Sequence, residues 1–336
     1  MKIVQVATGL ITIPPNGWGA VERIIWEYHT NLLQLGVNSE IKNWNEVVAE
    51  ENMIVHCHMA NTALDMRNRG IPYIYSLHDH HAEWYGKDSD VYRNNLEAIK
   101  GSVFSICHSK HVMEYFDETD KLFFLTHGVN TEFFKFRSYR KGFTNFSLLM
   151  VCNNGLGGDV SFDRKGFRYA IEAAKELHLP ITIAGPENNL NFFEHHKDLL
   201  EYEGLTLKCT NPTDDETLEL YQTHDIFMAP SMLEYGHPNL SILEAMSCGL
   251  PIVGKCNKYL PGMVHLDFLC TETVIDGIKT ATKNIHTLRD IQLEEREQYD
   301  WLQICKQLQK FYNAASVVTK NWTSEDTRNA YLKVYV

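Results

Sequence analysis

The stretch IFMAPSMLEYGHPNLSILEAMSCGLPIV, residues 226–253, contains a complete strand–helix–strand pattern. Residues 226–229 form a short apolar run that ends at Pro230. Apolar residues recur at helical spacing over 242–248 until Gly249 and Pro251 end the helix, and a second apolar run follows over 251–253. Two buried strands joined by a helix are typical of a parallel sheet, because parallel neighbours need a long crossover between them.

The same alternation extends in both directions. Strand-like apolar runs occur at 3–7, 53–57, 72–77, 103–107, 122–125, 146–152 and 181–184, and helix-like stretches separate most of them. The mixed basic and aromatic segment 133–143 interrupts the pattern, and we interpret it as a solvated hinge rather than a lipid-binding or nucleic-acid-binding patch. The fold class expected is therefore α/β, with doubly wound domains over 1–138 and 139–316. Thr323 and Asp326 resemble the capping box of a terminal helix.

Composition excludes several classes of protein. The chain has 336 residues, of which 44% are hydrophobic and 22% charged, so a disordered or fibrous protein is ruled out. The net charge of −12 disfavours nucleic acid as a partner. We expect no transmembrane segment and no signal peptide, and therefore a cytoplasmic protein, because no long apolar run occurs.

The polar loop before the 242–248 helix is the strongest candidate site. The helix begins near Asn239, Leu240 and Ser241, where the first backbone amides and the helix dipole favour an anion. Glu244 lies about one turn further on, and an ionised carboxylate accepts hydrogen bonds well from a ribose diol. The alternative is an ordinary helix cap followed by a surface glutamate.

Two further stretches suggest anion binding. Arg164 and Lys165 precede Gly166 at another predicted helix start, where free backbone amides also favour anions, although a surface basic pair is the alternative. Gly17 and Gly19 follow the first strand and permit close approach of a ligand to the backbone. Their spacing is not the three-glycine fingerprint of dinucleotide-binding proteins.

The histidine-rich sequence at 78–81 follows a predicted strand, where doubly wound sheets place ligands. A zinc site that also uses His56 and His58 is conceivable, but no ligand spacing matches a known zinc pattern. We favour a polar active-site or acceptor loop around His78, and no metal site.

The order of these motifs resembles that of retaining glycosyltransferases of family four. The late block PS…E…LEAM-CGLPIV resembles the family most specifically, and SKHV at 109–112, HGVN at 127–130 and IAG at 183–185 are similar to further family motifs. The resemblance implies the GT-B architecture, in which two Rossmann-like domains face each other across a cleft. It also implies that a C-terminal helix, residues 317–336 with Trp322, crosses back to the first domain.

The resemblance also implies roles for single residues. Arg164 and Lys165 would bind the donor pyrophosphate, with catalytic roles for Lys165, Glu234 and His78. The remaining donor-binding residues would be Gly17, Gly19, His237, Asn239, Leu240, Ser241 and Glu244. Two departures stand out: Glu234 and Glu244 are further apart than the family's two glutamates, and Cys152-Asn153-Asn154 replaces an expected arginine, for which Arg164 could substitute.

The implied function is retaining transfer of a sugar from a UDP- or GDP-sugar to a glycan, lipid-linked, protein or other hydroxyl acceptor. No cofactor is expected, and the reaction would be metal-independent if the cations stabilise the leaving diphosphate. A GT-B nucleotide-sugar epimerase or phosphorylase, and a non-catalytic nucleotide-sugar or glycan-binding protein, are the alternatives. A DNA-glucosylating enzyme is disfavoured by the negative charge.

Overall fold

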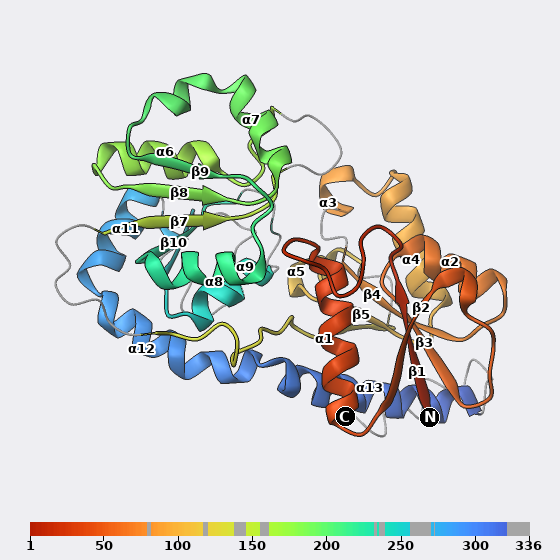
Figure 1. The fold of residues 1–336 in the computed structure, drawn as a ribbon. Helices are drawn as coiled ribbons and strands as arrows, with labels where there is room; N and C mark the ends of the chain where they lie inside the picture. Colours follow the sequence, from red (N-terminus) through yellow and green to blue (C-terminus); the bar gives the residue numbers. More distant parts are fainter. Residues whose placement is uncertain are drawn as a thin grey trace. The chain divides into compact units, whose positions relative to one another are not determined.

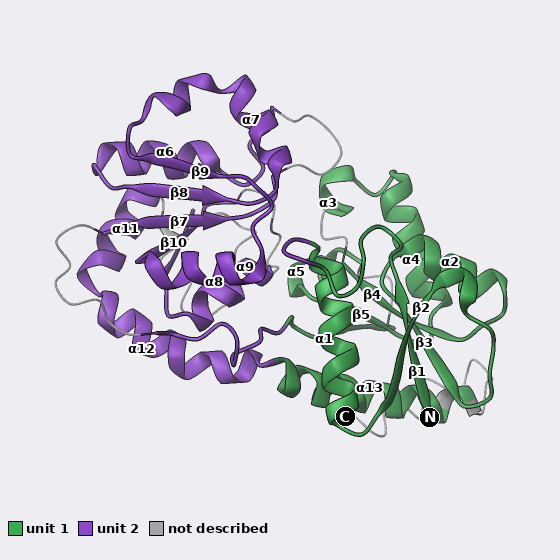
Figure 2. Ribbon diagram, viewed as in Figure 1, with its two compact units in different colours: residues 1–15, 19–127, 301–336 green, residues 16–18, 128–300 purple. Residues whose placement is uncertain are grey.

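The computed structural model describes residues 1–78, 82–116, 120–137, 146–154, 161–231, 234, 239–255, 270–271 and 273–320. The chain divides into two compact units (Figure 2). Unit 1 contains residues 1–15, 19–127 and 301–336, and unit 2 contains residues 16–18 and 128–300. These limits fall earlier along the chain than the boundaries expected at 138 and 316.

Unit 1 is built on a parallel six-stranded sheet with the strand order β2-β1-β3-β4-β5-β6 (Figure 1). The strands are β1 Lys2–Ala7, β2 Asn38–Asn43, β3 Met53–Cys57, β4 Tyr73–Leu77, β5 Ser105–Cys107 and β6 Leu122–Phe124. The apolar runs predicted five of them. No apolar run marks β2, because this strand lies at the edge of the sheet and carries mostly polar residues.

Helices of unit 1 connect these strands and cover the sheet. They are α1 Ala20–Gln34, η1 Trp44–Glu46, α2 Ala60–Asn68, α3 Ala82–Tyr85, α4 Asp90–Gly101, α5 Lys110–Tyr115 and α13 Trp301–Lys320. The long helix α13 returns to unit 1, where it packs on α1 and β3. A returning C-terminal helix was expected, but it begins at Trp301 rather than at residue 317, and Trp322, Thr323 and Asp326 lie outside the described residues.

Unit 2 contains a second parallel six-stranded sheet, with the order β12-β11-β10-β7-β8-β9. Its strands are β7 Leu148–Val151, β8 Ile181–Ala184, β9 Leu205–Lys208, β10 Ile226–Ala229, β11 Ile252–Lys255 and β12 Cys270–Thr271. Alternate residues of β7 enter different clusters: Leu148 and Met150 join one core, and Leu149 joins the other. Both faces of the sheet are therefore buried, as expected for a doubly wound fold.

Helices of unit 2 cover these two faces. They are α6 Phe167–Glu176, η2 Glu187–Asn189, α7 Leu190–His195, η3 Lys197–Glu201, α8 Asp214–Thr223, α9 Leu240–Ser247, α11 Val274–Lys283, α12 Ile285–Glu295 and η4 Arg296–Tyr299. The capping box predicted at Thr213 and Glu216 opens α8. None of the helices in the described ranges combines the length and the apolar character that a bilayer-spanning helix needs.

Gly166 makes the tight entry into α6 possible. Its φ is +79°, and an added Cβ would lie 2.4 Å from the carbonyl oxygen of Pro230. Gly36 has a similar φ of +74° but open space around a Cβ. We expect Gly36→Ala to cost only about 1–2 kcal/mol of left-handed strain, and Gly166→Ala to cost clearly more, because backbone must also move. Urea denaturation of both variants measures the difference, and equal losses would contradict the close packing at Gly166.

Candidate functional site

The strand order of unit 2 indicates where a ligand binds. Strands β8 and β9 extend the sheet on one side of β7, and β10 to β12 extend it on the other. In open α/β sheets, ligands bind outside the carboxyl ends of the strands at such a change of direction. Asn153 and Asn154 follow β7, and Ser231 follows β10. The candidate site is therefore the group of side chains around these two strand ends.

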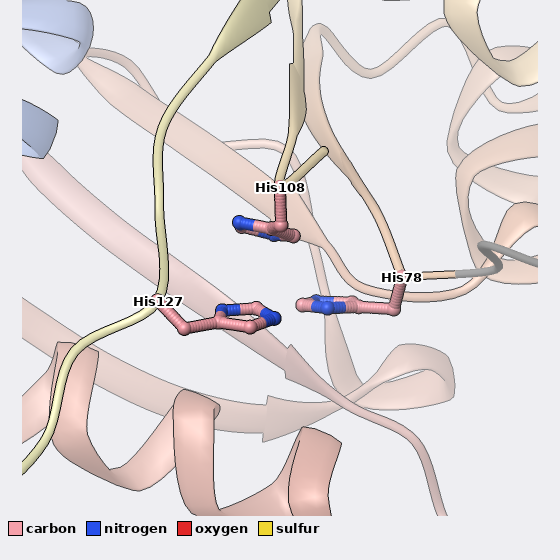
Figure 3. A group of neighbouring side chains, drawn as sticks. All are labelled: His78, His108 and His127. Carbon is pink, nitrogen blue, oxygen red and sulfur yellow. The ribbon is translucent and has the colours of Figure 1, made fainter. Parts of the chain in front are cut away.

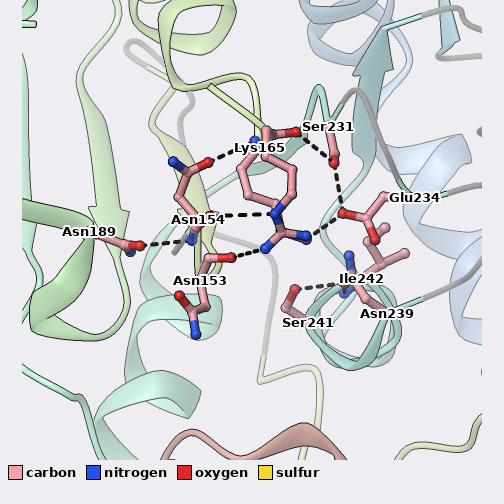
Figure 4. Close-up of polar contacts among 10 residues, drawn as sticks. Asn153, Asn154, Lys165, Asn189, Ser231, Glu234, Asn239, Ser241 and Ile242 are labelled. Carbon is pink, nitrogen blue, oxygen red and sulfur yellow. Dashed lines mark hydrogen bonds and ion pairs between the residues drawn. The ribbon is translucent and has the colours of Figure 1, made fainter. Parts of the chain in front are cut away.

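A buried ion pair lies at this position (Figure 4). The ammonium of Lys165 donates to Oε1 of Glu234, and Ser231 Oγ donates to the same oxygen over 2.7 Å. Lys165 is 8% exposed and Glu234 only 1%. Burying two charges is costly unless they pair closely. The charged state of Glu234 and that of Lys165 therefore each depend on the other residue. The structure thus brings together two of the three residues for which a catalytic role was expected.

Arg164 is held at the carboxyl end of β7. Its guanidinium donates to the carbonyl oxygens of Asn153 and Asn154. The Asn154 side-chain oxygen in turn accepts the backbone amide of Lys165 over 3.0 Å, and the Asn154 backbone amide donates to Asn189 Oδ1 over 2.9 Å. The arginine that the family resemblance implied after this strand is absent, and the Arg164 guanidinium occupies the neighbourhood of that position.

The start of α6 differs from the expectation of open amides. The Asp163 carboxylate accepts the backbone amides of Phe167 and Arg168 over 2.7 and 2.8 Å. Burial raises the pKa of Asp163, while these backbone hydrogen bonds oppose the shift. The expectation that these amides would bind an anion is wrong, because a carboxylate of the chain already fills their positions. Anion binding near α6 therefore depends on the Arg164 and Lys165 side chains alone.

The start of α9 keeps two amides for a ligand. Asn239 Oδ1 accepts the Ile242 amide over 3.0 Å and the Ser241 hydroxyl over 2.8 Å. Within the described part of the chain, no acceptor takes the backbone amides of Leu240 and Ser241. The start of this helix, with Asn239 and Ile242, lies beside Glu234 (Figure 4). Backbone amides at a helix start favour an anionic group, and the buried cations Arg164 and Lys165 add to this preference.

Glu244 lies on the second turn of α9. It is half-buried, and the Tyr221 hydroxyl donates to its Oε2 over 2.9 Å. Burial and the nearby Glu244 charge raise the pKa of Tyr221 well above its usual value, so this hydroxyl stays a donor. The tyrosine therefore holds the carboxylate of Glu244 in place.

The remaining predicted residues belong elsewhere or are not described. His78 and Gly19 belong to unit 1, and Gly17 groups with unit 2. Gly17 and Gly19 have φ of +79° and +130°, as expected for a loop that needs glycine. His237 lies outside the described residues, as do Asp79, His80 and His81.

Sequence reasoning missed three residues of this site. Asn154, Asn189 and Ser231 orient Arg164, Lys165 and Glu234 through hydrogen bonds. Asn154 and Ser231 follow predicted strands directly, which is the signal that could have identified them. Asn189 comes from a 3₁₀ turn after β8, and no motif marked it.

Comparison with known proteins supports the expected resemblance. Residues 156–266, which include Lys165 and α9, match the family described as Glycosyl transferases group 1. No curated protein matches the chain. The family match covers Arg164, Lys165, Glu234 and α9 of the candidate site, but not Asn153 and Asn154, and it supports the assignment of the chain as a transferase enzyme.

Solved structures confirm the fold class. HepE of Anabaena, solved with UDP and glucose, is 14% identical and has a TM-score of 0.65, over 93% of this chain and 99% of HepE. The catalytic domain of starch synthase IV from Arabidopsis thaliana, bound to ADP and acarbose, is 11% identical with a TM-score of 0.64, over 94% and 99%. WaaG, a glycosyltransferase involved in lipopolysaccharide biosynthesis, is 13% identical with a TM-score of 0.60, over 94% and 99%. The two Rossmann-like units thus form the GT-B fold that was expected.

Proposed function

We propose that the protein transfers a sugar from a nucleoside diphosphate sugar to a hydroxyl acceptor. The observation that carries the proposal is the buried Lys165–Glu234 pair beside the start of α9, at the switch point of the unit 2 sheet. A diphosphate placed there would meet Lys165, Arg164 and the amides of Leu240 and Ser241. The family match over residues 156–266 supports the same reaction class.

The chemistry of this reaction requires positive charge at one end of the donor. The bond from the anomeric carbon to the diphosphate oxygen breaks, and the leaving diphosphate gains negative charge in the transition state. Groups that are fixed in a buried site stabilise this charge more than they stabilise the ground state. In our proposal Lys165 and Arg164 supply this charge without a metal ion, the reaction retains the anomeric configuration, and Glu234 and His78 contact the donor sugar.

The donor proposed is a UDP- or GDP-sugar, and the acceptor a glycan, lipid-linked or protein hydroxyl, in the cytoplasm. HepE was solved with UDP and glucose, and starch synthase IV with ADP and acarbose, which supports a nucleoside diphosphate donor. A thermal-shift panel of UDP-, GDP- and ADP-sugars would identify the donor, because a ligand that binds only the folded protein raises its Tm.

Turnover separates the transferase from its alternatives. With the donor identified, free nucleoside diphosphate should appear much faster when a suitable acceptor is present. Tight donor binding without release of diphosphate on any acceptor would assign a binding protein instead. Donor conversion without release of diphosphate would assign an epimerase.

Glu244→Ala is expected to weaken binding of the nucleoside diphosphate by about 10- to 100-fold, because hydrogen bonds to a charged group contribute about 1.5–3 kcal/mol. Titration calorimetry with UDP or GDP measures this loss. Glu219→Ala, an exposed glutamate on the neighbouring α8, is the matched control and should bind normally. Unchanged affinity in Glu244→Ala would contradict the ribose role.

A further inference from the structure

Histidines follow four neighbouring strands of the unit 1 sheet. His58 follows β3, His78 follows β4, His108 follows β5, and His127 lies shortly after β6. These strands are adjacent and parallel, so their carboxyl ends meet at one edge of the sheet. The four imidazoles therefore gather from positions that are far apart in the sequence. The proposed transfer reaction uses only His78 among them.

His78, His108 and His127 form the tightest part of this group (Figure 3). One ring nitrogen from each residue lies within 4.8 Å of those of the other two. His127 and His78 point toward each other from separate segments, and the His108 ring lies beside both. The centroids of the His108 and His127 rings are 3.9 Å apart, and those of His78 and His108 are 4.8 Å apart. His108 and His127 are each 1% exposed.

A hydrogen bond to the backbone determines which ring nitrogen of His108 carries a lone pair. Its Nδ1 lies 2.7 Å from the carbonyl oxygen of Leu125, which can only accept. Nδ1 therefore carries the proton, and in the neutral ring Nε2 carries the lone pair. Metal-binding histidines commonly donate their other ring nitrogen to a backbone carbonyl or carboxylate in this way, which fixes both tautomer and ring orientation.

A buried chain of side chains sets the tautomer of His78. The Nε2 of His58 lies 2.9 Å from Gln5 Oε1, so this nitrogen donates. With the single ring proton of neutral His58 on Nε2, its Nδ1 is an acceptor. His78 Nε2, 3.0 Å away, must then donate to it. The lone pair of neutral His78 is on Nδ1, which is the atom it would give to a metal.

Gln5 in turn is fixed by the returning helix α13. Its Nε2 donates to the Tyr312 hydroxyl over 2.8 Å, and that hydroxyl donates to His56 Nδ1 over 2.6 Å. His56 completes the chain by donating from Nε2 to Ser76 Oγ over 2.8 Å. The amide of Gln5 thus cannot rotate without breaking two buried bonds, and the tautomers of His58 and His78 follow from its orientation.

We propose that His78, His108 and His127 bind one divalent transition metal ion of the zinc class. Three neutral imidazoles plus a water molecule form an established zinc coordination set, and imidazole selects zinc, copper or nickel over magnesium and calcium. The neighbouring Cys107 thiol is not part of this group, and its Sγ contacts the Ser109 carbonyl oxygen.

Binding requires the three rings to move together. Zinc–nitrogen distances of about 2.0–2.1 Å place tetrahedral ligand atoms about 3.4 Å apart. The spread of 4.8 Å must shorten, and the nearly parallel rings must turn their edges toward one point. Rotation about χ2 of histidine is soft, and each of the three residues lies beyond the end of its strand. An ion bound there would coordinate the His78 imidazole, which we assign to the donor sugar. That consequence rests on the proposed function, whereas metal binding itself does not.

The test measures metal binding to the full chain without any nucleotide sugar, so its outcome is independent of the transfer reaction. After treatment with a chelator, the wild type should bind one equivalent of Zn²⁺ by titration calorimetry. Co²⁺ in its place should give the intense visible absorption of a four-coordinate ion. Loss of a residue that only hydrogen-bonds a metal ligand commonly costs 10- to 100-fold in metal affinity, so loss of a ligand itself in His108→Ala or His127→Ala should weaken binding by at least about 100-fold.

His195→Gln is the matched control, since His195 is an exposed histidine on α7 whose Nδ1 contacts a backbone carbonyl. It should bind Zn²⁺ as the wild type does. Should His108→Ala fail to fold, His127→Asn decides, because the amide keeps polarity and removes the imidazole. A wild type without stoichiometric binding, or cluster variants that bind as tightly as His195→Gln, would overturn the site.

Discussion

Lys165→Ala is expected to lower kcat for sugar transfer by about 10²–10³-fold, the usual cost of removing one fixed group that stabilises developing negative charge. Lys165 is buried next to Glu234 and shares its loop with Arg164, so bulk water cannot replace the missing ammonium well. The loss should appear mainly in kcat, because the charge on the diphosphate grows as the bond breaks. Single-turnover assays at saturating donor measure it.

Lys175→Ala is the matched control for this experiment. Lys175 lies in the last turn of α6 and is exposed, so its removal should leave kcat unchanged. Both variants need a melting curve, so that rates are compared on folded protein. Near-full turnover in Lys165→Ala would refute the placement of the leaving diphosphate at this residue.

Glu234→Ala is expected to lower the free energy of unfolding by about 3–5 kcal/mol, the cost of leaving one charge of a buried pair without its partner. Glu234 is 1% exposed and accepts from both Lys165 and Ser231. The change therefore leaves the buried Lys165 ammonium without its carboxylate partner, whereas the Ser231 hydroxyl keeps the Arg164 carbonyl oxygen as an acceptor. Urea denaturation followed by circular dichroism measures the loss.

A double variant isolates the ion pair from the rest of the packing. Lys165→Met combined with Glu234→Gln removes both charges at similar volume, so it should recover most of the stability that Glu234→Ala loses. If the double variant is as unstable as Glu234→Ala, the loss comes from packing rather than from an unpaired charge. Both the double variant and Glu234→Ala should transfer sugar more slowly than the wild type.

The sequence predicted the local features of the fold well. Capping residues such as Thr213 and Glu216 act within one turn, and short apolar runs with glycine or proline at their ends mark buried parallel strands. The edge strands β2, β9 and β12 were not predicted: β2 carries mostly polar residues, and β9 is partly exposed along its length. Periodicity records burial, so an element that is only half buried gives a weak signal.

The candidate site was predictable in its residue types but not in its pairings. Lys165 and Glu234 are 69 positions apart, and their contact follows from β7 and β10 being neighbours, which no local pattern specifies. The same reason hid the meeting of His78, His108 and His127. At the start of α6 the opposite error occurred: Asp163 was visible in the sequence, but its capture of the Phe167 and Arg168 amides depends on loop geometry.

The discontinuity of unit 1 has a consequence for synthesis on the ribosome. Helix α13 supplies Tyr312, which hydrogen-bonds Gln5 and His56 in the interior of unit 1. The strands of this unit are synthesised long before α13. Unit 2 can close as soon as residue 300 leaves the exit tunnel, whereas the first sheet must wait for α13 with buried polar groups unsatisfied. Unit 1 is thus synthesised first but completes its folding after unit 2. Truncation within α13 should therefore destabilise the amino-terminal unit first.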